Sequence, residues 1–297
     1  MFDLRYHVAS LAAAVLALII GILVGVGISS GGFVKKGERK LLTDQIADLR
    51  NRLGAANTRA HDLNEAQRAG QAFVQDTYPA LMAGRLRGRR IALVFVGSID
   101  DGARSLIERT LSDAGAAAPI RIRALKVPIE LGQLDAVLAA RPALAELAVA
   151  TGAAAIGREL GQEFVLGGQT PLWSVLSSQL VAERLGGQQE AADGVVVVRS
   201  AEPQQGETAR FLAGLYSGLA SQGAPAVGVE TSSSLPSAVD AFTHSKLSTV
   251  DDLETAPGRL SLAALLAGAS PGHYGTKDTA KDGLLPPIAP VLAKVGG

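Results

Sequence analysis

The stretch "RIALVFVGSIDDGARSLIERTLSDAG", residues 90–115, decides the fold. Residues 90–96 form a nearly continuous apolar run, which is typical of a strand buried on both faces of a sheet. Apolar positions then recur at helical spacing up to Gly115, a residue suited to ending a helix. These positions are Ala103, Leu106, Ile107, Thr110, Leu111 and Ala114. A buried strand followed by an amphipathic helix predicts the first unit of a parallel α/β sheet.

The same alternation recurs towards the C-terminus. "IRIRAL" at 120–125 alternates like a half-exposed edge strand, and residues 131–185 carry mainly helical patterns. "DGVVVVRS" at 193–200 begins a second unit, and a short strand near "KLSTV", 246–250, precedes a helix whose first turn contains Pro257. We therefore predict an α/β fold with a Rossmann-like parallel-sheet domain at residues 89–275, followed by a flexible tail at 276–297.

The N-terminus carries a long apolar segment. Residues 8–28 contain no charged side chain, and as a helix they would span roughly 30 Å, the thickness of the hydrocarbon core of a bilayer. A cleaved secretion signal is the alternative, but it has a shorter apolar core and a small-residue cleavage site, which is not found here. The segment predicts an uncleaved, single-pass transmembrane anchor at residues 1–33.

Two further patterns predict a dimer. Small residues recur every four positions in the apolar segment, as in closely packed membrane helices, and an a/d heptad register begins directly after it. We predict a parallel homodimer with a coiled-coil stalk at residues 34–80. Its seam would contain Gly21, Gly25, Leu42, Ile46, Leu49 and Leu53. The alternative is an amphipathic helix lying on the chain's own domain, because the register weakens after Leu63.

Composition and motifs narrow the function. Lys plus Arg and Asp plus Glu balance at 28 each, so the charge does not favour a nucleic-acid partner. The sequence contains no cysteine, which excludes disulfides and thiolate ligands. It also lacks the dinucleotide-binding and Walker glycine motifs and the G-x-S-x-G nucleophile motif. We expect a protein that is not an enzyme, with a hydrolase or transferase that uses the cleft of the sheet as a lesser alternative.

Metal-ligand candidates are few. His244 and His273 are the two histidines of the predicted domain, and the pairs Asp100–Asp101 and Asp251–Asp252 follow strands. At the carboxyl edge of a parallel sheet, such carboxylates can hold a hard cation such as Mg²⁺. We favour the interpretation that these carboxylates cap the following helix or complete a turn. We therefore expect no metal site, and the candidates for one, if it exists, are His244, His273, Asp251 and Asp252.

Three segments together resemble the actinobacterial family of MctB-like copper transporters: "LRYHVASLAAAVLALIIGILVG" at 4–25, "LSTVDDLETAPGRLSLAALLAG" at 247–268 and "GHYGT" at 272–276. The resemblance implies a cell-membrane protein of the envelope, with its α/β domain outside the cytoplasm and a role in copper efflux or tolerance. The basic cluster at residues 35–40 would favour the opposite orientation under the positive-inside rule. We follow the family for the expected topology.

The sequence contains few side chains that could act as copper ligands. Copper(I) prefers thiolates and thioethers, and the chain has only Met1 and Met82 besides its scattered histidines. Copper is thus an expected cargo without clear ligand residues, and we expect no cofactor. The family resemblance extends to corynebacterial envelope proteins that act in cell separation. The alternative function is accordingly a non-catalytic scaffold that binds an envelope protein partner controlling peptidoglycan hydrolysis.

Overall fold

The computed structural model describes the backbone of residues 4–30, 36–144 and 152–289, and the side chains of residues 10–25, 43–144 and 152–289. The chain divides into two compact units, Met1–Gly70 and Gln71–Gly297. The border between them falls inside one helix, so the end of that helix belongs to the second unit.

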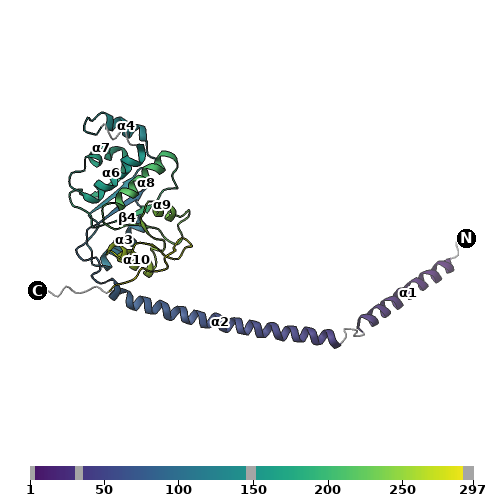
Figure 1. Ribbon diagram of the computed structural model, residues 1–297. Helices are drawn as coiled ribbons and strands as arrows, with labels where there is room; N and C mark the ends of the chain where they lie inside the picture. The colour runs from purple at the N-terminus through teal and green to yellow at the C-terminus, as the bar shows by residue number, and fades with distance from the viewer. Residues whose placement is uncertain (1–3, 31–35, 145–151, 290–297) are drawn as a thin grey trace. The chain divides into compact units, whose positions relative to one another are not determined.

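The first unit contains helix α1, Leu4–Ser30, and most of helix α2, Lys36–Met82 (Figure 1). Within the described ranges, no helix combines the length and the apolar character needed to cross a membrane. The predicted transmembrane anchor is therefore not confirmed.

The predicted stalk coincides with a continuous helix of 47 residues. Along it, Ile46, Leu49 and Leu53 of the apolar heptad stripe are 49%, 64% and 62% exposed, and every side chain of residues 43–73 is exposed. Gly21 and Gly25 of α1 are also exposed, whereas the side chain of Leu42 lies outside the described residues. Helix formation agrees with the heptad pattern, and the pairing of two such helices stays a prediction.

The second unit is built on a seven-stranded sheet with the order β3-β2-β1-β4-β5-β6-β7. All neighbours pair in parallel except β2 and β3, which pair antiparallel. The strands are β1 Ile91–Val96, β2 Arg121–Leu125, β3 Val181–Gly186, β4 Gly194–Arg199, β5 Ala226–Val229, β6 Ser248–Val250 and β7 His273–Tyr274. The predicted α/β class with a mostly parallel sheet is confirmed.

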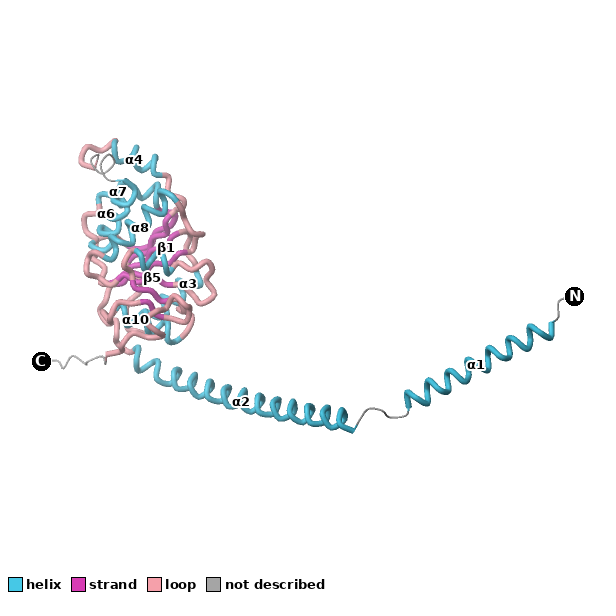
Figure 2. Tube along the Cα trace, turned by 45° about the vertical axis from the view of Figure 1, so that its right-hand side comes forward, coloured by secondary structure: helices cyan, strands magenta, loops and turns pink. Residues whose placement is uncertain are grey.

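Helices cover both faces of this sheet (Figures 1 and 2). One apolar core joins the sheet to α4 Leu131–Ala139, α6 Gly152–Leu166, α7 Pro171–Leu180, α8 Gly206–Ala220 and α9 Val239–His244. A second core joins the opposite face to α3 Asp101–Asp113 and α10 Ala256–Leu266. Strand β1 is buried at every position and contributes alternate side chains to both cores, as its unbroken apolar run predicts.

Strand β2 differs from the sequence prediction. Its alternating pattern predicts a half-exposed edge strand, but all five residues are buried and β3 pairs along its outer side. The guanidinium groups of Arg121 and Arg123 lie inside the fold and donate hydrogen bonds to backbone carbonyls. Strand β3 lies at the end of the region that the sequence predicts to be helical. The prediction missed this strand because the helical pattern of α7 continues without a break into Val181.

The domain is longer at both ends than predicted. Met82 and Leu86, which precede the expected boundary at residue 89, are fully buried in the second core. At the other end, Thr276 and Lys277 donate backbone hydrogen bonds to Asp251, and Ser261 donates to the carbonyl of Leu284. The described part of the segment expected to be a flexible tail therefore belongs to the domain.

Candidate functional site

The carboxyl edge of the sheet offers the first candidate site. Strand order reverses between β1 and β4, and in open α/β sheets ligands bind outside the carboxyl ends of the strands at such a switch point. A cavity of about 210 Å³ lies there, between the ends of β1, β4 and β5. Its lining includes Asp100, Gly102, Arg199, Glu230, Thr231 and Ser234. Apolar side chains, among them Leu106, Val198 and Leu253, complete the lining, so the cavity offers both apolar surface and hydrogen-bonding groups.

Asp100 reaches this cavity from the turn after β1. Its Oδ1 atom accepts a hydrogen bond of 2.9 Å from the backbone N–H of Ala103, so it caps helix α3. Gly97 in the same turn has a φ of +109°, and a Cβ atom there would lie 2.9 Å from the backbone nitrogen of Ala201. Of the two interpretations of the Asp100–Asp101 pair, the structure favours helix capping for Asp100.

Behind the cavity lies a buried ion pair. Lys277 Nζ donates to a carboxylate oxygen of Glu230 and, over 2.9 Å, to the carbonyl of Ser234. The Glu230 carboxylate also accepts hydrogen bonds of 2.7 Å from Ser237 Oγ and from the backbone N–H of Ala238. Only 6% of the Glu230 side chain is exposed. A buried carboxylate with this many donors holds the loop of residues 230–238 against the segment that carries Lys277.

Sequence analysis missed both residues of this pair. Glu230 directly follows β5, as Asp251 directly follows β6, so the same rule about strand ends identifies it. Lys277 gave no such signal, because it lies in a segment predicted to be flexible.

Asp251 accepts hydrogen bonds from the backbone around residues 272–276, the short C-terminal segment of the family resemblance. Its side chain is buried, and Oδ1 accepts hydrogen bonds from the backbone N–H groups of Thr276, at 2.8 Å, and Lys277, at 3.3 Å. Gly275 comes so close that a Cβ atom there would lie 2.0 Å from this oxygen. The two motifs, residues 247–268 and 272–276, thus meet at the carboxylate of Asp251. We call the arrangement of Asp251 and residues 275–277 the Asp251 clasp.

Asp252 is fully buried beside the clasp. Its Oδ2 atom accepts a hydrogen bond of 2.9 Å from Thr255 Oγ1, while Oδ1 has no partner within the described part of the chain. Burial raises the pKa of this carboxyl, and the negative charge of Asp251 raises it further. Both effects favour the neutral form, which is a poor ligand for a cation.

The two histidine candidates lie on different elements. His273 Nδ1 is 3.0 Å from Thr249 Oγ1, and His244 Nδ1 is 2.6 Å from the carbonyl of Asp240. Among the described residues, no three or more His, Cys, Asp or Glu side chains are grouped so that they could hold a metal ion. The structure therefore does not bring His244, His273, Asp251 and Asp252 together as one metal site.

Comparison with known proteins gives the family. Residues 1–285 match the family model described as "Copper transport outer membrane protein, MctB". Proteins named "Copper transporter MctB" from Mycobacterium bovis and Mycobacterium tuberculosis are each 28% identical over 324 residues, covering 93% of this chain and 96% of theirs. Because the match includes both helices of the N-terminal part and nearly all of the α/β domain, this chain belongs to the MctB family of copper transport outer membrane proteins.

Proposed function

We propose that this chain acts in copper efflux and tolerance as an anchored protein of the cell envelope, with its α/β domain outside the cytoplasm. The observation that carries the proposal is the family match over residues 1–285, which includes the apolar N-terminal helix as well as the domain. Apolar side chains such as Leu11 and Leu23 of α1, which are 70% and 66% exposed, support an apolar environment for this helix.

The donor chemistry supports an indirect role for the domain in copper transport. The thioether of Met82 is fully buried in the apolar core, so it is not accessible to an ion. His244 and His273 each use Nδ1 in a contact with a neighbouring oxygen atom, which leaves isolated single imidazoles for metal. Copper(I) prefers soft sulfur ligands over such sites. We infer that the domain acts without catalysis, by binding another component at its carboxyl edge.

A copper-tolerance assay in a host lacking the chain tests this proposal. Re-expression of the full chain should restore tolerance, and so should the double variant His244→Ala/His273→Ala. Lys277→Met should restore it poorly, because this change leaves the Glu230 carboxylate buried without its charged partner. Lys281→Met, an exposed lysine of the same segment, is the matched control and should behave like the parent chain.

Two results would contradict the proposal. If a host that lacks the chain tolerates copper normally, the chain has no role in copper tolerance. Loss of tolerance in the double-histidine variant, with the protein folded and present in the membrane fraction, would show that the domain handles copper directly. Thermal unfolding of each purified variant separates these results from loss of the fold.

The proposed topology has its own test. A reporter enzyme that is active only outside the cytoplasm, fused after residue 297, should be active, and a reporter active only inside should not. The opposite result would overturn the envelope location and agree with the basic cluster at residues 35–40.

We also propose that α2 forms a parallel homodimeric stalk. Its support is the heptad spacing of the apolar stripe that includes Ile46, Leu49 and Leu53, whose side chains are exposed in the single chain. Light scattering of residues 36–297 should give twice the chain mass, and Leu49→Asp/Leu53→Asp should give a monomer because it places charges on the seam. A monomer before mutation would mean that the stripe covers another surface. The scaffold function in peptidoglycan hydrolysis stays a prediction from sequence alone.

A further inference from the structure

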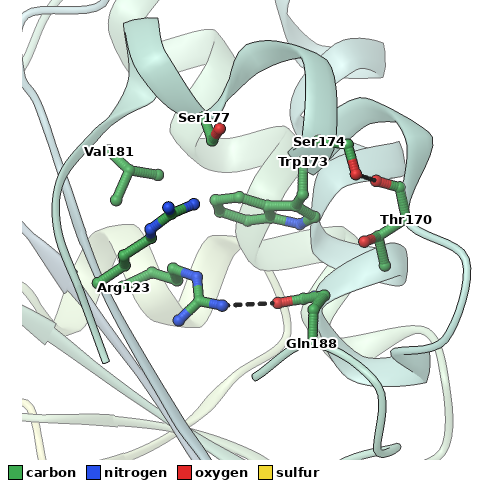
Figure 3. Close-up of a pocket in the computed structure, with 8 residues that line it drawn as sticks. Arg123, Thr170, Trp173, Ser174, Ser177, Val181 and Gln188 are labelled. Atoms are coloured by element: carbon green, nitrogen blue, oxygen red, sulfur yellow. Dashed lines mark hydrogen bonds between the residues drawn. The ribbon is translucent and has the colours of Figure 1, made fainter. Parts of the chain in front are cut away.

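A second cavity, of about 310 Å³, lies against strands β2 and β3 and helix α7 (Figure 3). It shares no lining residue with the cavity at the carboxyl edge of the sheet. Two arginines line it, Arg123 of β2 and Arg184 of β3. The remaining lining includes the hydroxyl groups of Thr170, Ser174 and Ser177 and the ring of Trp173. None of the side chains that line the cavity is a carboxylate.

The two arginines are directly opposite each other. Arg123 and Arg184 are partners in the antiparallel register of β2 and β3. Like charges at directly opposed positions destabilise a sheet, and an anion bound between them would offset that repulsion. Arg184 is exposed, and beyond its backbone pairing in the sheet its guanidinium has no hydrogen bond or ion pair within the described residues.

Arg123 is bound only to neutral acceptors. Its guanidinium donates to the carbonyls of Ile122 and Leu185, each at 2.8 Å, and to the side-chain oxygen of Gln188 at 3.1 Å (Figure 3). These contacts fix the orientation of the guanidinium without neutralising its charge. Arg123 as a whole is only 7% exposed. Burial lowers the pKa of Arg123, and the positive charge of Arg184 lowers it further.

A third guanidinium adds to the positive charge. Arg121 lies two residues before Arg123 and so on the same face of β2, and it is fully buried. Its Nη1 donates to the carbonyl of Phe164 at 2.7 Å, while Nε and Nη2 have no partner in the described structure. Burial lowers its pKa to about 10, and the charge of Arg123 contributes to this lowering. The three arginines thus repel one another electrostatically.

The half-buried carboxylate of Glu163, on α6, is engaged elsewhere. Glu163 accepts hydrogen bonds of 3.0 Å from the backbone N–H groups of Leu172 and Trp173, at the start of α7. This carboxylate therefore satisfies the N-terminus of the helix. A ligand in the cavity has to be held by the side chains of the two arginines and the hydroxyl groups.

Trp173 gives the cavity an aromatic wall. Its Nε1 donates to the carbonyl of Leu160 at 2.7 Å, so the polar edge of the indole is turned towards α6. The ring also packs against Phe164, with 5.7 Å between the centroids, and it is 5% exposed. Figure 3 shows the ring between Ser177 and the guanidinium of Arg123. The wall is therefore rigid and apolar next to a cationic group.

We propose that this cavity binds a small organic oxyanion, whose carboxylate or phosphate group lies at Arg123 and Arg184 and whose apolar part lies against Trp173. Guanidinium groups bind both kinds of oxyanion through paired hydrogen bonds. The volume is at the lower end of the range for small-molecule sites, which favours a ligand with one ring or a short chain.

The chain contains its own probe for this site. Trp173 is the only tryptophan, so intrinsic tryptophan fluorescence of the full chain reports on the cavity alone. The full chain is titrated with phenyl phosphate, benzoate, inorganic phosphate and phenol, with potassium chloride at matched ionic strength as the salt control. Phenyl phosphate or benzoate should change the fluorescence with saturation, inorganic phosphate should bind more weakly, and phenol and chloride should give no saturable change.

Two variants make the result specific. Arg184→Gln should weaken binding of the responding aryl anion at least tenfold, and because Arg184 is exposed the fold should survive. Arg109→Gln, an exposed arginine of α3 that does not line the cavity, should leave the affinity unchanged. An equal affinity in Arg184→Gln, or no saturable response to either aryl anion, would overturn the proposal.

Discussion

At the scale of single residues, the backbone conformation of one glycine determines the Asp251 clasp. Gly275 has a φ of +142°, a region that other residues enter only with strain, and it leaves no space for a Cβ atom next to Asp251 Oδ1. The backbone of residues 275–277 can therefore approach the carboxylate closely enough to donate hydrogen bonds. Any side chain at residue 275 would push this backbone away from Asp251.

Gly275→Ala should consequently lower the free energy of unfolding of the domain by more than the about 1–3 kcal/mol expected for backbone strain alone. Gly268→Ala is the matched control, because Gly268 also has a positive φ, +98°, but a Cβ atom there would meet nothing within 4 Å. Urea unfolding of both variants measures the difference. Equal losses would mean that the clasp adds nothing beyond strain.

The buried carboxyl of Asp252 makes stability depend on pH. Its pKa is raised in the folded state by burial, so the folded chain binds this proton more readily than the unfolded chain does. The resulting stability is present at low pH, below the unfolded pKa, and is lost as the pH rises through the folded pKa. At neutral pH the cost of the buried charge, or of keeping it protonated, is largest.

Asp252→Asn should therefore gain stability relative to the parent chain as the pH is raised from about 4 to about 7, because the amide has no charge to bury. Its oxygen can still accept the hydrogen bond from Thr255 Oγ1. Urea midpoints of both proteins across this pH range give the measurement, with the exposed Asp278→Asn as a control for loss of a carboxylate. A difference that does not change with pH would contradict the assignment.

At this scale the sequence predicted positions better than environments. Asp251 and Asp252 were found because they follow a strand, and they do lie at the carboxyl edge of the sheet. Whether Asp251 binds a cation or a backbone N–H depends on residues 275–277, which are distant in sequence and reach Asp251 only through the pairing of β6 with β7. The burial of Arg121 and Arg123 was missed for the same reason, since it depends on β3.

At the scale of elements, α6 and α8 pack with almost no side chains between their backbones. Cβ atoms at Gly157 and Gly161 would lie 2.1 Å and 2.4 Å from carbonyl oxygens of α8. Cβ atoms at Gly214 and Gly218 would lie 1.9 Å and 2.1 Å from carbonyl oxygens of α6. Each helix thus presents two glycines four residues apart to the other, which lets the helices approach closely.

Gly214→Ala should destabilise the domain by about 3 kcal/mol or more, because the added methyl group has to push the whole of α8 away from Ala154. Gly132→Ala in α4 is the control, since a Cβ atom there meets nothing within 4 Å and alanine favours a helix by up to about 1 kcal/mol. Urea unfolding of both variants measures the effects. A Gly214→Ala variant as stable as the control would show that the two helices can separate easily.

Such a contact is hard to predict from the sequence. The four glycines have a recognisable spacing within each helix, but the chain contains 34 glycines, so the spacing alone is a weak signal. Amphipathic periodicity was a stronger signal, and it predicted α3 correctly because Ile107 and Leu111 face a single core. Helix α7 and strand β3 were not separated in the sequence, since no glycine or proline stands between them.

At the scale of the whole molecule, the end of α2 belongs to the domain. The hydroxyl group of Tyr78 donates to Asp113 of α3 over 3.1 Å and accepts from Arg259 Nε of α10 over 3.2 Å. Met82, the last residue of α2, and Leu86, in the turn that follows it, are fully buried in the same core. The chain therefore divides near Gly70, inside the helix, and not at residue 89, where the sequence predicts the domain to begin.

This division predicts how truncated proteins behave. A fragment of residues 71–297 should unfold cooperatively and at the same temperature as the domain in the full chain, because it keeps every core residue described for the second unit. A fragment of residues 90–297 lacks Tyr78, Met82 and Leu86, and loss of each buried aliphatic side chain costs about 2–5 kcal/mol. It should therefore melt at a much lower temperature or aggregate.

Met82→Ala/Leu86→Ala within residues 71–297 should reproduce most of this loss, which separates the missing side chains from the missing helix. Equal melting temperatures for the two fragments would place the domain boundary at residue 89, as the sequence predicts, and would make the buried end of α2 irrelevant to the stability of the domain.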